Sequence, residues 1–137
     1  MFDVNFWAIL VSAIVSMVIG SIWYGPLFGK PFMEAMGMNQ WTPEQRAAMT
    51  KKMWMSYLGQ FIASLVMFYV LARFIDDIGA LTVRDGLMVA AWTWIGFVVP
   101  VKLGDLLWGG KPILFWLGIG NMLLTLLATG AIIGFWA

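Results

Sequence analysis

Four long apolar segments, separated by shorter polar stretches, dominate the pattern of hydrophobic and polar positions along the chain. A helix rises about 1.5 Å per residue, so about 20 apolar residues cross the roughly 30 Å hydrocarbon core of a bilayer. The pattern predicts transmembrane helices over about 6–24, 43–74, 83–106 and 112–136. The fold class that follows is an all-α integral membrane bundle of four helices, with residues 1–137 forming a single transmembrane domain.

The second predicted helix is longer than a bilayer requires. Thr42 is a good N-cap, Pro43 suits the first helical position, and Gln45 completes a capping box. A helix from Pro43 to about Phe74 would be roughly 48 Å long, well beyond the apolar core of the membrane. We therefore expect its first turns to extend beyond the bilayer into water.

Composition agrees with a membrane protein and restricts the available chemistry. Hydrophobic residues make up 62% of the chain and charged residues 11%, where a soluble domain carries roughly a quarter charged residues. The absence of cysteine and histidine removes thiolate nucleophiles, imidazole bases and the usual zinc, haem and iron–sulfur ligands. We expect no catalytic residue, metal or cofactor, and no enzyme activity. The net charge of +1 gives no basic field for nucleic acid.

The distribution of basic residues predicts the orientation. The first and third connections hold six of them, against two, Arg73 and Arg84, in the second connection. The six are Lys30, Arg46, Lys51, Lys52, Lys102 and Lys111. Because cytoplasmic loops carry the excess of lysine and arginine, both connections are predicted in the cytoplasm. Both termini would then lie outside, on the periplasmic side of a cell (inner) membrane.

Small residues predict where helices approach closely. Ala8, Ser12, Ser16 and Gly20 recur every four positions in the first helix and form one stripe, which we expect to face protein. The last helix contains a G-x-x-x-G pattern near its end, formed by Gly130 and Gly134. Such patterns let two helix backbones come together in a membrane.

Polar residues at mid-depth form the first candidate site. The candidate polar cavity comprises Gln60, Trp94, Asn121 and Thr125. In one interpretation their side chains line a solute site, to which the Trp94 indole N–H contributes. In the other they form interhelical hydrogen bonds, each worth about 0.6–2 kcal/mol, and only hold the bundle together. The sequence leaves both interpretations open.

The end of the first helix forms the second candidate. Gly25-Pro26 is expected to end the helix, and Trp23 lies where an aromatic belt meets the membrane interface. We interpret the segment as an interfacial elbow with a lysine at the headgroups, which also closes a site against the third helix. Its residues are Trp23, Tyr24, Pro26, Phe28, Gly29 and Lys30.

Lys102 and Asp105 form a candidate charged pair at the end of the third helix. They are three residues apart and lie on neighbouring faces if the helix continues past Pro100. Ionisable residues inside membranes are costly and often functional, which favours an ion or proton relay, or a headgroup site. The alternative is a lysine that extends to the interface and an aspartate that caps the helix.

Two stretches resemble a known family. One reads G-S-I-W-Y-G-P-L-F-G-K from Gly20 to Lys30, and the other combines Trp94-Ile95-Gly96-Phe97 with the turn Gly110-Lys111-Pro112. Nearly end to end, the chain resembles the bacterial family of small four-helix membrane proteins catalogued as DUF1761. Where members often carry an aromatic residue after the Gly-Lys step, this chain has Pro31-Phe32. The resemblance implies a four-helix membrane protein and supplies no activity.

Three function classes stay open, of which an intramembrane enzyme is the least favoured because histidine and cysteine are missing. Small-residue stripes and mid-depth polar groups favour a homo-oligomeric, channel- or carrier-like protein for a small solute or ion. Four short helices rarely enclose a pathway alone, so further copies of the chain and the lipid bilayer are the expected partners. The alternative is a lipid-binding or accessory membrane protein without transport, whose elbow and basic first connection bind headgroups or a partner.

Overall fold

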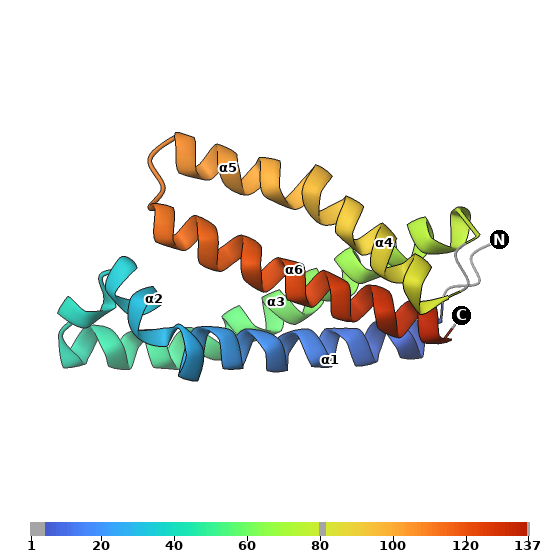
Figure 1. Ribbon diagram of the computed structural model, residues 1–137. Coiled ribbons are helices and arrows are strands. Elements are labelled where there is room, and N and C mark those ends of the chain that lie inside the picture. Colours follow the sequence, from blue (N-terminus) through green and yellow to red (C-terminus); the bar gives the residue numbers. More distant parts are fainter. Residues whose placement is uncertain (1–4, 80–81, 137) are drawn as a thin grey trace.

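The computed structural model describes residues 5–79 and 82–136, and this part of the chain is helical without a β-strand (Figure 1). Two of its elements, η1 and η3, are π-helical turns, and η2 is a 3₁₀ turn. In chain order the elements are α1 (Phe6–Ile22), η1 (Trp23–Leu27), α2 (Gly29–Ala35), η2 (Met38–Gln40), α3 (Pro43–Asp77), α4 (Val83–Thr93), η3 (Trp94–Val98), α5 (Val99–Leu107) and α6 (Pro112–Trp136).

Four helical segments of the described chain are long and apolar enough to cross a membrane. They are Phe6–Leu27, Pro43–Asp77, Val83–Leu107 and Pro112–Trp136. The η1 turn continues α1, and η3 joins α4 to α5 into one segment. The prediction of an all-helical chain with four long apolar helices is therefore confirmed.

The start of α3 follows from its capping residues. The Gln45 backbone N–H donates to Thr42 Oγ1 at 3.2 Å, and the Thr42 backbone N–H donates to Gln45 Oε1 at 2.9 Å. Both bonds of the predicted capping box are thus present, and Pro43 occupies the first helical position. The helix then continues for 35 residues to Asp77.

The prediction that Gly25-Pro26 ends the first helix is wrong. The chain stays helical to Leu27, and the Phe28 backbone N–H donates to the Trp23 carbonyl at 2.9 Å. Proline has no N–H for the regular bond of an α-helix, and the wider π turn accommodates this missing donor. The helical path breaks at Phe28, where φ is −128° and ψ is 18°, and α2 then begins.

Helix α6 lies between the other long helices and contacts α1, α3, α4 and α5 (Figure 1). Its closest approach is to α4, where Gly86 meets Gly130 and Gly134 meets the backbone at Thr82. A Cβ added at any of these three glycines would run into the backbone of the facing helix. The predicted G-x-x-x-G contact is therefore present and joins α6 to α4.

The buried core is concentrated at one end of the bundle. We call this the closed end; α1 and α4 begin there, and α3 and α6 end there (Figure 1). Its buried apolar side chains are Ala8, Ile9, Ala13, Phe68, Leu71, Ala72, Ile75, Ala90, Leu126 and Ile133. At the opposite, open end, residues 43–60 of α3 are exposed throughout and α5 has no buried residue.

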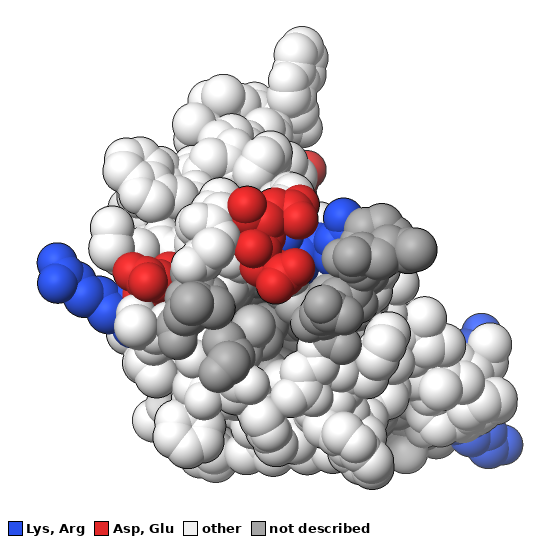
Figure 2. Space-filling model, turned by 90° about the vertical axis from the view of Figure 1, so that its right-hand side faces the viewer, with Lys and Arg blue, Asp and Glu red and all other residues white. Residues whose placement is uncertain are grey.

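Charge also differs between the two ends. Figure 2 looks onto the closed end and shows acidic side chains gathered there. In this region α3 ends with Asp76 and Asp77, and α4 carries Asp85 in its first turn. The connections that hold six of the eight lysines and arginines lie at the open end.

Candidate functional site

Two π-helical turns share one sequence pattern. Each begins with tryptophan and has glycine two residues later: η1 reads W-Y-G-P-L and η3 reads W-I-G-F-V. Pro26 lies inside η1, and Pro100 follows directly after η3 at the start of α5. Both prolines lack the N–H that an α-helical bond needs, which explains why the helix widens at these two places. Turns of this kind are rare and frequently mark functional sites.

The two tryptophans bind the same turn of α6. Trp23 Nε1 donates to the Leu117 carbonyl at 2.9 Å, and Trp94 Nε1 donates to the Ile119 carbonyl at 2.8 Å. A Cβ at Gly120 would lie 2.7 Å from Trp23 Cζ2, so the missing side chain lets the indole reach the helix backbone. We call Trp23, Trp94 and residues 117–121 of α6 the tryptophan clamp. Trp23 therefore holds α6 through its indole N–H.

Asn121 carries an unmet polar atom in this clamp. Its Oδ1 is buried and has no hydrogen-bond partner. An unpaired polar group in an apolar interior costs about 1–3 kcal/mol, and native structures keep few of them. Asn121 follows Gly118 by three residues, so the two share one face of α6.

Lys102 reaches the same face of α6 from α5. Its Cε and Cδ lie 3.8 and 3.9 Å from the position that a Cβ of Gly118 would occupy. Lys102 and Gly118 lie at comparable distances from the turn between α5 and α6. The end of the Lys102 side chain thus lies against α6 beside Gly118. It makes no ion pair with Asp105, so the predicted charged pair is not formed.

The predicted polar cavity is brought together only in part. Trp94 donates to the Ile119 carbonyl, two residues before Asn121, and Thr125 lies buried one turn beyond Asn121 on α6. The Trp94 indole N–H, considered as a donor to a ligand, is used by the Ile119 carbonyl. Gln60 is exposed on α3 and donates to Ser64 of its own helix at 3.5 Å. It is not hydrogen-bonded to the other members of the set.

The elbow is ordered through contacts between aromatic rings and backbone. The ring centroids of Trp23 and Phe28 are 4.6 Å apart, and those of Tyr24 and Phe32 are 4.7 Å apart. Gly29 is buried, and a Cβ there would lie 2.9 Å from the Tyr24 carbonyl oxygen.

The elbow packs chiefly on α6. The sequence had suggested packing against the predicted third helix, 83–106, instead. One reason is Trp23, whose indole is bound to α6. Another is Lys111, next to the start of α6, whose Nζ donates to the Ala35 carbonyl at the end of α2. Lys30 is exposed.

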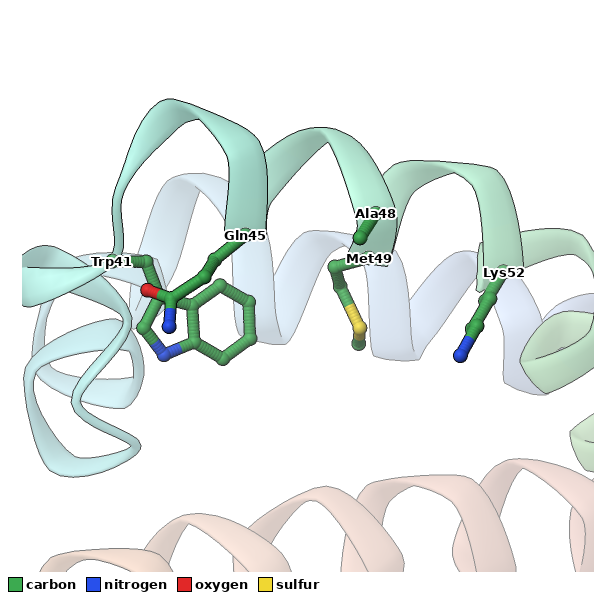
Figure 3. A pocket seen from close by; sticks show the side chains of 5 residues that line it. All are labelled: Trp41, Gln45, Ala48, Met49 and Lys52. Atoms are coloured by element: carbon green, nitrogen blue, oxygen red, sulfur yellow. The ribbon is translucent and has the colours of Figure 1, made fainter.

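A groove at the open end was not anticipated. Figure 3 shows side chains of α3, and that of Trp41 just before α3, pointing into the space in front of the opposite helix. The groove has a volume of about 370 Å³ and is lined by Trp41, Gln45, Ala48, Met49 and Lys52. The spacing of three and four residues would have put them on one helix face. The spacing alone does not show that these side chains leave a groove between them.

Residues 7–134 match the model of a family described as "Protein of unknown function (DUF1761)". The match covers nearly the whole chain, including both π turns and all of the clamp. No curated protein and no solved structure gives a match. Within the described residues, no group of three acidic, histidine or cysteine side chains could hold a metal ion.

Proposed function

The chain belongs to the DUF1761 family of proteins of unknown function, and we propose that it is an oligomeric, channel- or carrier-like membrane protein for a small solute. The observation that carries this proposal is the buried, unpaired Oδ1 of Asn121 within the tryptophan clamp. Inside a membrane, irregular backbone and unmet polar groups are tolerated where protein encloses them or where they line a cavity. Two π turns and an unmet amide converge on one turn of α6, which favours a solute site there.

In the proposed orientation the open end faces the cytoplasm. The basic connections at that end support this, because lysine and arginine accumulate in cytoplasmic loops. Residues 43–52 of α3, which include Arg46, Lys51 and Lys52, have no buried member, in keeping with a helix whose first turns extend beyond the bilayer. The clamp then lies between the cytoplasmic entrance and the closed end.

The oligomeric part of the proposal rests on Gln60. Its side chain is exposed on α3, and its 3.5 Å hydrogen bond to Ser64 is at the limit of useful geometry. A primary amide facing lipid is costly, whereas a facing helix of a second copy would supply hydrogen-bond partners. Native mass spectrometry from mild detergent is expected to give a dimer or higher oligomer that Gln60→Leu shifts toward monomer. A wild-type monomer would contradict this part.

Flux through proteoliposomes tests the transport activity. We expect a panel of small anionic, neutral and cationic solutes to include one that the wild-type protein admits. Asn121→Leu should reduce this flux at least tenfold, because the variant removes the amide that would face the solute. Leu124→Ala, an exposed change one turn further along α6, is the matched control and should retain flux. Absence of flux across the panel, or undiminished flux in Asn121→Leu, would contradict the proposal.

A second candidate function is lipid binding without transport, favoured by the groove beside Lys52. An indole, an amide and an ammonium line it at the level expected for the cytoplasmic headgroups. Anionic phospholipid retained in native mass spectra and lost in Lys52→Ala would support this function. Such retention, combined with absence of flux, would favour it over the first.

A further inference from the structure

The side chain of Lys102 is half-buried as a whole, and its ammonium has no ion-pair partner among the described residues. Among residues 5–79 and 82–136, no carboxylate lies within ion-pair distance of it, and the ion pair found there joins Arg73 to Asp77 at 3.9 Å. The end of its aliphatic stem lies against α6 at Gly118. An ammonium beside an apolar helix is stabilised by a facing anion, which makes an anion the natural partner of Lys102.

Lys102 packs against the face of α6 on which Asn121 lies. Gly118 and Asn121 are separated by three residues, which on a helix surface means a distance of about 5–6 Å between side-chain positions. The Lys102 stem covers the first position, and the unpaired Oδ1 belongs to the second. The two side chains thus lie within reach of a single small molecule. Lys102 offers N–H donors, whereas Oδ1 of Asn121 needs a donor from its ligand.

The surroundings favour a negatively charged ligand. The connections at the open end carry six basic residues against three acidic ones, Glu34, Glu44 and Asp105. Asp76 and Asp77 of α3 and Asp85 of α4 lie instead at the closed end, where acidic side chains gather (Figure 2). An excess of basic residues around an entrance raises the local concentration of anions.

We propose that Lys102 and Asn121 form a binding site for a small hydroxycarboxylate-type anion. The carboxylate accepts hydrogen bonds from the Lys102 ammonium, and the hydroxyl donates to Oδ1 of Asn121. This inference names the solute class of the proposed function, and it depends on that function only for the role of binding in transport. A carboxylate on a lipid headgroup shares part of this chemistry. The experiment therefore separates a soluble anion from a lipid headgroup as the ligand.

Equilibrium binding of radiolabelled L-lactate to the full chain in uncharged detergent tests the site. Propionate, which lacks the hydroxyl, and lactamide, which lacks the charge, serve as competitors. We expect lactate to bind more tightly than either. Lys102→Gln should weaken the binding of lactate and of propionate about tenfold or more, which is the loss expected for one charge-assisted hydrogen bond. Asn121→Leu should remove the difference in affinity between lactate and propionate.

Matched variants separate binding from folding. Lys102→Arg keeps the charge and should retain part of the affinity. Lys51→Gln removes one positive charge from the same end of the molecule and should leave lactate binding unchanged. Near-UV circular dichroism, which reports on the packing of the tryptophans, shows whether each variant is folded.

Three results would overturn the site. The first is lactamide binding as tightly as lactate, and the second is undiminished lactate binding in Lys102→Gln. The third is undiminished lactate binding in Lys102→Arg together with loss of lactate binding in Lys51→Gln. Nanodiscs distinguish the lipid source. Lactate binding that persists in zwitterionic lipid and disappears when anionic phospholipid is present would assign Lys102 to headgroups and overturn a soluble-anion site.

The outcome for transport is separable from the outcome for binding. Lactate binding that depends on Lys102, without flux of any solute in proteoliposomes, would overturn the proposed transport and leave the anion site standing. Flux of neutral or cationic solutes without lactate binding would overturn the anion site and leave transport standing.

Discussion

The indole of Trp23 occupies the space beside Gly120 that any other residue's side chain would fill. The ring lies against the α6 backbone, and its Nε1 donates to the Leu117 carbonyl at 2.9 Å. A hydrogen bond from a side chain to a backbone carbonyl between two membrane helices needs this close approach. The relationship connects a π turn at the end of α1 to the centre of α6.

Gly120→Ala is predicted to break that contact. Its Cβ would lie 2.7 Å from Trp23 Cζ2, so the indole must move and its hydrogen bond to Leu117 is strained or lost. We expect a destabilisation of about 1–3 kcal/mol, measured as a lower thermal midpoint in detergent. Gly59→Ala on α3, where nothing lies within 4 Å of an added Cβ, is the control and should be neutral or slightly stabilising. Equal effects in both variants would contradict the clamp.

Gly86→Ala is predicted to be more damaging than Gly120→Ala. At this crossing a Cβ meets the Gly130 carbonyl, and two helix backbones must separate instead of one side chain moving. We expect a loss above about 3 kcal/mol, visible as aggregation or a strongly lowered midpoint in chromatographic stability assays. The matched control is Gly96→Ala in η3, which has open space around an added Cβ. A well-folded Gly86→Ala protein would show that this helix crossing is wrong.

Asn121→Leu is predicted to stabilise the protein while it impairs the site. The buried Oδ1 makes no hydrogen bond, so replacing the amide with an apolar side chain of similar size removes a desolvation penalty of about 1–3 kcal/mol. Thermal midpoints in detergent should rise by a few degrees without added solute. A fall of similar size would instead mean that the amide holds the bundle together.

Lys111→Met is predicted to loosen the elbow. The ammonium donates to the Ala35 carbonyl at the end of α2, where a cation also interacts favourably with the helix dipole. A spin label at residue 33, on α2, should become more mobile in the variant. Lys30→Met, which removes an exposed lysine from the same elbow, should leave the label unchanged. Identical spectra for Lys111→Met and wild type would rule out this attachment.

Cysteine labelling tests the proposed orientation directly, because the chain contains no cysteine. A membrane-impermeant maleimide added outside intact cells should label Ile78→Cys at the closed end. It should label Met49→Cys at the open end only after the membrane is permeabilised. The reverse pattern would place the termini in the cytoplasm and contradict the orientation predicted from the basic connections.

The helices and their boundaries were largely predictable from the sequence. Apolar segment length fixes how many helices can cross a bilayer, and local capping chemistry at Thr42 and Gln45 fixes where α3 begins. The contact between Gly130 and α4 was also foreseeable, because the spacing of small residues is a local property of one helix. These features depend on neighbours in the sequence, which is why pattern analysis finds them.

The π turns were predictable from the sequence only in part. A proline inside an apolar helix predicts a disturbance, and for Pro26 we expected the helix to end there. Whether a helix ends or widens depends on hydrogen bonds such as that from the Phe28 N–H to the Trp23 carbonyl, and on the packing that stabilises the wider turn. The repeated W-x-G before each proline was a signal that would have joined Trp23 and Trp94 as a pair.

The sequence by itself determined four apolar helices long enough to cross a membrane, their caps, and the polar residues available to them. Only the tertiary structure decided that Trp94 binds α6 at Ile119 while Gln60 stays outside on α3, and that Lys102 lies against α6 at Gly118 rather than pairing with Asp105. The physical reason is that these contacts depend on the depth and rotation of each helix relative to the others. Those quantities are set by the summed packing of all four helices, and no local pattern in the chain encodes them.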